Sequence, residues 1–239
     1  MSFAPALHAE WLKIRTLRSL IGSLGAVVLA TAAFSALSAA DAADTDPLFT
    51  VYFGVSFGQI AAIAFGTAAM AAEFRGGALR LTLAAVPDRR RWFTAKATAI
   101  ALPALVVGLV TGAVTFVVGR AALGAGTTAV PAWSEGVRGA VGCGAYLTLM
   151  ALFAAGVTAV LRSGVATLST LIPFLLIVSF VVGDVSGGVA DFLPDRAGQV
   201  VLHSDWDGSL GPWTGLAVTA LWTVAALLAG AWSVGRRDA

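Results

Sequence analysis

The sequence predicts an all-α integral membrane protein with six transmembrane helices, because three observations agree. Only 12% of its 239 residues are charged and 58% are hydrophobic, whereas soluble globular domains carry about 25% charged residues. Apolar stretches of about 20 residues recur along the chain, and a helix of that length crosses about 30 Å of hydrocarbon. The segments between these stretches alternate between rich and poor in Lys and Arg. We therefore expect residues 1–239 to form a single transmembrane domain.

Six stretches are long and apolar enough to be membrane-spanning helices. The expected spans are Ser19–Ala40, Tyr52–Ala72, Ala97–Gly119, Gly139–Leu161, Gly164–Gly183 and Trp213–Gly235. Pairs of glycines four residues apart, Gly54 with Gly58 and Gly108 with Gly112, favour close approach of neighbouring helices.

The basic residues predict the orientation of these spans. Three of the fifteen, Arg120, Arg138 and Arg196, fall on one side of the membrane together with nine of the thirteen acidic residues. The other side holds Lys13, Arg15, Arg18, Arg75, Arg80, Arg89, Arg90, Arg91, Lys96, Arg162, Arg236 and Arg237. The positive-inside rule places this second group, and with it both termini, in the cytoplasm. The segment 184–212 is then an extracytoplasmic loop.

The interiors of the spans contain almost no ionisable residue, and channels and secondary carriers usually need such residues. Gln59 is the largest polar side chain within a span. It either makes an interhelical hydrogen bond or lines a substrate path. Pro173, in the middle of the expected fifth span, either kinks that helix for gating or serves ordinary packing.

No catalytic constellation is present. An intramembrane enzyme needs His, Asp, Glu or Cys clustered at one depth, and the spans lack such a cluster. His8 and His203 are expected on opposite sides of the membrane and so cannot share a metal. His203 with Asp205 and Asp207 fits a hydrated turn better than a ligand site. There is also no GxxxxGK[ST] phosphate loop. We expect a protein that is not an enzyme, with no catalytic residue, metal site or cofactor of its own and no nucleic-acid partner.

The most basic loop, residues 73–96, contains a short apolar segment. Gly76-Gly77 is expected to end the second span and Pro87 to end a helix over Ala78–Val86. Asp88 can cap the next helix. The helix presents one apolar face, made by Leu79, Leu83 and Val86.

This short helix needs a surface to pack on, because so few residues do not form a stable helix alone. Anionic lipid and a groove on a soluble partner are equally good candidates. Glu73, just before the helix, either pairs with Arg75, Arg80 or Lys96 and pins the loop to the spans, or remains a solvated acid at a helix end.

The stretch EFRGGALRLTLAAVPDRRRWFTAK resembles the first cytoplasmic loop of permease subunits of type-2 ATP-binding-cassette (ABC) exporters. The matching positions are Glu73, Phe74, Arg75, Gly77, Leu79, Arg80, Thr82, Leu83, Pro87, Arg89, Ala95 and Lys96. The opening HAEWLKIRTLRS is similar to the cytoplasmic start of the same family at Glu10, Trp11, Lys13 and Arg18. With the six-span layout, the resemblance covers nearly the whole chain.

The resemblance implies that the short helix is a coupling helix that docks on a separate cytoplasmic ATPase subunit, which would carry ATP and Mg. The residues implied in coupling are Glu73, Arg75, Leu79, Arg80, Leu83, Val86 and Arg89. A second copy of this permease, or a related one, would complete the transporter. The implied location is the cell membrane, as a multi-pass protein, and the Arg-rich, Lys-poor composition indicates a bacterium.

The resemblance also makes residues 1–18 an interfacial helix. Leu7, Trp11 and Ile14 align on one face of that helix, but Glu10 and Arg18 fall near the same face. The spans offer an apolar, lightly polar lining, which is compatible with export of lipids, hydrophobic drugs, antibiotics or peptides, and so with multidrug or antibiotic efflux. Two alternatives stay open: a stand-alone carrier or channel, and a permease-like regulatory or immunity subunit that binds an ATPase without moving substrate.

Overall fold

The computed structural model describes residues 3–40, 46–123, 130–175, 188, 190–204 and 208–236, and within them the chain is helical with no strand. The α-helices are α1 (Phe3–Thr16), α2 (Arg18–Ala40), α3 (Pro47–Tyr52), α4 (Val55–Ala71), α5 (Ala78–Ala85), α6 (Arg89–Leu123), α7 (Trp133–Leu161), α8 (Gly164–Pro173), α10 (Pro194–Gln199) and α11 (Pro212–Arg236). Three 3₁₀ turns accompany them: η1 (Ala72–Phe74), η3 (Ala190–Phe192) and η4 (Val200–Leu202).

Five apolar helical units in these residues are long enough to cross a membrane: Arg18–Ala40, Pro47–Phe74, Arg89–Leu123, Trp133–Leu161 and Pro212–Arg236. They contain or closely match the expected first, second, third, fourth and sixth spans. Helix α8 begins at Gly164, as the expected fifth span does, and the part of that span after Leu175 lies outside the described residues. The protein is therefore an all-α, multi-pass membrane protein.

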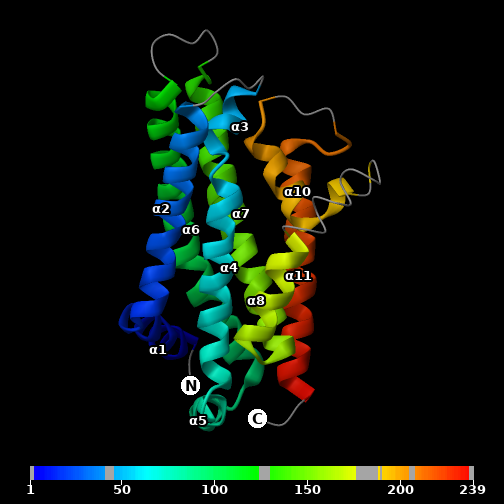
Figure 1. The fold of residues 1–239 in the computed structure, drawn as a ribbon. Helices are drawn as coiled ribbons and strands as arrows, with labels where there is room; N and C mark the ends of the chain where they lie inside the picture. Colours follow the sequence, from blue (N-terminus) through cyan, green and yellow to red (C-terminus); the bar gives the residue numbers. More distant parts are fainter. Residues whose placement is uncertain are drawn as a thin grey trace.

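Helix α7 is at the centre of the bundle and packs against α4, α6 and α11, while α2 covers α4 and α6 (Figure 1). Helices α1 and α5 lie at the end of the bundle where α11 finishes, which we call the α5 end. Helices α3 and α10 lie at the opposite end, which we call the α10 end. The start of α6, with Arg89 to Arg91, belongs to the α5 end and its last turn, with Arg120, to the α10 end.

The paired glycines lie where helices approach most closely, as expected from their spacing. A Cβ added to Gly58 would lie 1.9 Å from Thr31 Oγ1 on α2, and one added to Gly112 would lie 2.7 Å from the Cα of Ala140 on α7. Gly54 meets the backbone of Thr31 and Gly108 that of Gly144 in the same way. Side chains at these positions would push α2 from α4 and α6 from α7.

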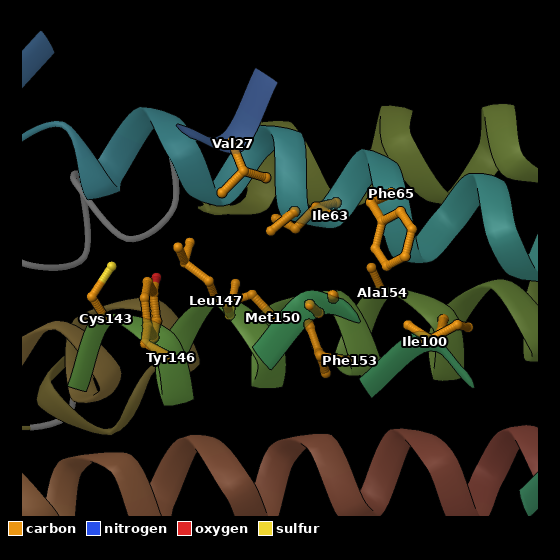
Figure 2. Packing of buried hydrophobic residues seen from close by; sticks show 14 of the residues in the cluster. Val27, Ile63, Phe65, Ile100, Cys143, Tyr146, Leu147, Met150, Phe153 and Ala154 are labelled. Atoms are coloured by element: carbon orange, nitrogen blue, oxygen red, sulfur yellow. The ribbon is translucent and has the colours of Figure 1, made fainter. Parts of the chain in front are cut away.

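The core between these helices is apolar and continuous. Figure 2 shows Tyr146, Met150 and Ala154 on α7 facing Ile63 and Phe65 on α4. The described residues between α8 and α11 form η3, α10 and η4, and α10 and η4 pack on α7 and α11.

Candidate functional site: a buried charge cluster beneath helix α5

The loop from α4 to α6 folds locally as its residues predict. Gly76 and Gly77 both have positive φ values, 59° and 75°, which glycine adopts at little cost. Helix α5 starts directly after them and ends at Ala85, before Pro87. The Asp88 carboxylate accepts hydrogen bonds from the backbone N–H groups of Arg90 (3.1 Å) and Arg91 (3.2 Å) and so caps α6.

Helix α5 turns its apolar face, with Leu79, Leu83 and Val86, toward the bundle. That face is therefore not exposed to a partner protein, as one of the two expected arrangements required. Leu79 is buried, and Leu83 and Val86 pack partly against the protein's own core. Leu81 is 76% exposed, and Arg80 and Ala84 beside it are exposed as well. The apolar face stabilises α5 against the bundle, since so short a helix needs packing. The solvent-exposed face is the one that carries Arg80, Leu81 and Ala84.

Four charged side chains from three segments meet beneath α5. Lys96 Nζ lies 2.7 Å from Glu10 Oε2 and 2.8 Å from Glu73 Oε1. Lys13 Nζ lies 2.8 Å from Glu10 Oε1 and 2.8 Å from Glu73 Oε1. We call Glu10, Lys13, Glu73 and Lys96 the charge cluster. It connects α1, η1 at the end of α4, and α6.

The charge cluster is almost sealed from solvent. Glu10, Glu73 and Lys96 are each 2% exposed, and only the Lys13 side chain, at 37%, reaches the surface. Two carboxylates and two ammonium groups balance, which is what allows charges to be buried. Burial alone would lower the pKa of Lys13, but its hydrogen bonds to Glu10 and Glu73 outweigh burial and raise that pKa above its ordinary value. Lys13 therefore remains charged at neutral pH.

Helix α5 is joined to the charge cluster by Thr82. Its hydroxyl lies 3.3 Å from Glu73 Oε2 and 3.0 Å from the carbonyl of Ala78. A cleft of about 380 Å³ opens next to this contact, lined by Glu73, Phe74, Gly77, Leu79, Arg80 and Arg162. Arg80 on the exposed face of α5 and Glu73 of the charge cluster thus line the same cleft.

Arg75 and Arg89, which flank α5 in the sequence, differ in their contacts. Arg75 is exposed next to the glycine turn. Arg89 Nη1 instead donates to the carbonyl of Val234 (2.7 Å) and so ties the start of α6 to the end of α11.

Gln59 lies in a buried polar network nearer the α10 end. It accepts a hydrogen bond from the Tyr146 hydroxyl and donates one to the carbonyl of Ser56 (3.1 Å). Gln199 in α10 donates to the Tyr146 oxygen (3.2 Å) and accepts from the Ser56 hydroxyl (3.0 Å). The amide of Gln59 is therefore engaged between helices in this conformation. Pro173, in contrast, is exposed in the last position of α8.

A pair of titratable side chains, Asp46 and His203, is at the α10 end. Asp46 Oδ2 lies 2.9 Å from His203 Nδ1, and the Asp46 carboxylate also accepts from the backbone N–H groups of Phe49 and Ser204. These hydrogen bonds outweigh burial and lower the pKa of Asp46, while burial lowers the pKa of His203 despite its acidic partner. His203 thus pairs with Asp46, and Asp205 and Asp207, named with it above, lie outside the described residues.

Sequence reasoning named Lys96 as a partner of Glu73 but did not identify Glu10 and Lys13 as members of the same cluster. A signal was available: Glu10 interrupts the apolar face of α1, and a buried acid needs a cation. In the structure Glu10 is on the inward face of α1 with Ala6 and Ile14.

In comparisons with protein-family models and with curated proteins, no match to this chain was found. The likeness to ABC exporter permeases therefore rests on the two motifs and on the helix layout.

Proposed function

We propose that this chain is the membrane-spanning subunit of an ATP-driven ABC exporter of the bacterial cell membrane, coupled to a separate cytoplasmic ATPase through α5. The observation that carries the proposal is the charge cluster under an exposed helix. A partner would bind the exposed face of α5, at Arg80, Leu81 and Ala84. Movement of α5 would reach the end of α4 through the contact of Thr82 with Glu73. It would reach α1 and α6 through the ion pairs that Lys96 makes with Glu10 and Glu73.

The mechanism follows from how those bonds transmit displacement. Three elements that contribute to the charge cluster cannot move independently without separating buried opposite charges, which costs several kcal/mol. A movement of α5, driven by ATP binding in the partner, would therefore turn α1, α4 and α6 together. Since α4 and α6 both pack on α7, that turn would alter the interior of the bundle, where an apolar drug or antibiotic would pass.

Co-purification with site-directed crosslinking tests the partner. The chain is expressed with its neighbouring genes in a Cys143→Ser background, with one cysteine at Leu81 or at Ala84. We expect a soluble ATPase to co-purify and to crosslink at both positions. Leu79→Cys on the same helix is the matched control, because Leu79 is buried and should react weakly. The proposal would be contradicted if no ATPase is recovered and if cysteines at Leu79, Leu81 and Ala84 react equally with a thiol-reactive lipid analogue.

Reconstitution tests the coupling. With the ATPase present, vesicles should show ATP-dependent flux of a hydrophobic dye, and Glu73→Gln should reduce that flux while ATPase binding persists. Flux that needs no ATPase would make the chain a stand-alone carrier. ATPase binding with no flux of any tested compound would make it a regulatory subunit.

A further inference from the structure

A groove with a basic rim separates the start of α6 from the end of α11 at the α5 end. Its volume is about 560 Å³. Arg89, Arg90 and Arg236 form its rim, and Phe93, Leu228 and Trp232 line its wall. None of the described residues that line it is acidic. The groove is separate from the charge cluster, where every charge has a partner.

Two of the three arginines of the rim, Arg89 and Arg236, contact neighbouring groups of the protein. Arg89 Nη1 donates to the carbonyls of Val234 (2.7 Å) and Gly235 (3.3 Å), which fixes the end of α11 against α6. The guanidinium of Arg236 lies 4.8 Å from the centre of the Trp232 ring. Arg90 is exposed in the first turn of α6. Three positive charges therefore converge where the apolar wall begins.

The apolar wall continues along α11 into the membrane-spanning part of the chain. Leu221, Val224, Leu228 and Trp232 are 69%, 51%, 66% and 59% exposed, and their spacing puts them on one face of the helix. On a membrane-spanning helix such a face contacts acyl chains. An apolar track that begins next to a cluster of arginines is complementary to a phospholipid with a negatively charged headgroup, because the arginines suit the phosphate and the track suits an acyl chain.

We propose that this groove is a binding site for one anionic phospholipid of the leaflet at the α5 end. Its phosphate contacts Arg90 and Arg236, and one acyl chain lies along Leu228 and Trp232. The proposal needs only that the chain spans a membrane, and it does not depend on the exporter function.

A second groove provides an internal comparison. It lies between α1 and α6, has a volume of about 590 Å³, and is lined by Leu7, Trp11, Leu102 and Val106 among others, with no arginine among its described lining residues. Its size is similar, but its described lining has one histidine, His8, in place of three arginines. It should accept acyl chains without preference for the headgroup, so headgroup selectivity is assigned to the α6–α11 groove alone.

Native mass spectrometry of the purified full chain, titrated with phosphatidylglycerol or phosphatidylcholine, tests the rim. We expect one phosphatidylglycerol to bind preferentially. Each arginine should contribute roughly fivefold, so Arg90→Gln with Arg236→Gln should weaken its binding roughly 25-fold and leave phosphatidylcholine binding unchanged. The matched control is Arg75→Gln with Arg91→Gln, which removes the same charge from the α5 end outside the groove. Equal losses in both double variants would overturn the proposal.

The apolar track is tested separately. Ala231→Trp should fill the groove and reduce phosphatidylglycerol binding with the rim intact. Ala229→Trp should not, because Ala229 is exposed about 100° around α11 from Leu228 and does not line the groove. Full displacement of the lipid by millimolar inorganic phosphate would make the rim a simple anion site and overturn the lipid assignment. A change from dimer to monomer in Arg90→Gln with Arg236→Gln, with lipid binding unchanged, would make the groove an interface between copies and would also overturn it.

Discussion

The two ends of the bundle hold titratable side chains in very different surroundings. At the α5 end, the charge cluster places four full charges within hydrogen-bond distance, three of them at 2% exposure. At the α10 end, Asp46 and His203 form one pair whose side chains are 22% and 18% exposed. Burial strengthens interactions between charges and raises the cost of losing a partner. The comparison teaches that the α5 end is built to hold elements together, whereas the α10 end has a weaker contact that responds to pH.

The largest effect should come from removing the most buried cation. Lys96→Met leaves the Glu10 and Glu73 carboxylates buried with only Lys13 between them, and we expect it to lower the free energy of unfolding by about 3–5 kcal/mol. Unfolding in mixed detergent, followed by circular dichroism, measures this. Lys96→Met with Glu73→Gln should recover part of the loss because one negative charge is removed as well. A loss under about 1 kcal/mol in the single variant would mean that the charge cluster is not buried within the folded protein.

Lys13 sharpens the comparison within the charge cluster. Its side chain is 37% exposed, so water can solvate what Lys13→Met leaves behind. We expect a loss of about 1–2 kcal/mol, below that of Lys96→Met, in the same unfolding measurement. The order of the two losses is the decisive result, and a larger loss for Lys13→Met would contradict the burial argument.

The pair at the α10 end should make stability depend on pH. The folded-state pKa values of Asp46 and His203 are both lowered, so their contribution is present at high pH and is lost as pH falls. For His203 the loss begins near its ordinary pKa of 6.5. Arg138 Nη2 donates to the backbone carbonyl of His203 (2.7 Å) and so holds this residue near the start of α7.

Melting temperatures between pH 7.5 and 5 check this expectation. The melting temperature should fall with pH in the wild-type protein and fall less in His203→Asn. His8→Asn is the control, because His8 is exposed in α1 at the α5 end. An equal reduction of the pH dependence by His8→Asn would rule out the pair at the α10 end as its cause.

The smallest effect is expected from an exposed ion pair at the α5 end. Arg91 Nε lies 3.6 Å from Asp88 Oδ2, with side chains 42% and 50% exposed. Arg91→Gln should change the free energy of unfolding by less than about 0.5 kcal/mol, since exposed pairs are screened by water. The same measurement on Lys96→Gln gives the contrast between exposed and buried charge at one end of the molecule.

The helices were predictable from the sequence because their signals are local. Helix α5 was expected at Ala78–Val86 and is found at Ala78–Ala85, since two glycines precede it and Pro87 follows it. The spans were predictable because about 20 apolar residues in a row can be satisfied only as a helix in lipid. The face that α5 exposes was not predictable in this way, because its apolar residues suit a partner and the chain's own core equally well.

By itself, the sequence determined that the chain is helical, apolar and membrane-spanning, and where its basic residues concentrate along it. These properties depend on composition and on neighbours within one helix. Only the tertiary structure decided that Glu10, Lys13, Glu73 and Lys96 meet, because Glu10 and Lys96 are 86 positions apart. The same is true of Arg90 and Arg236, which line one groove because α6 begins where α11 ends. Such juxtapositions depend on how whole helices pack, and no local pattern encodes them.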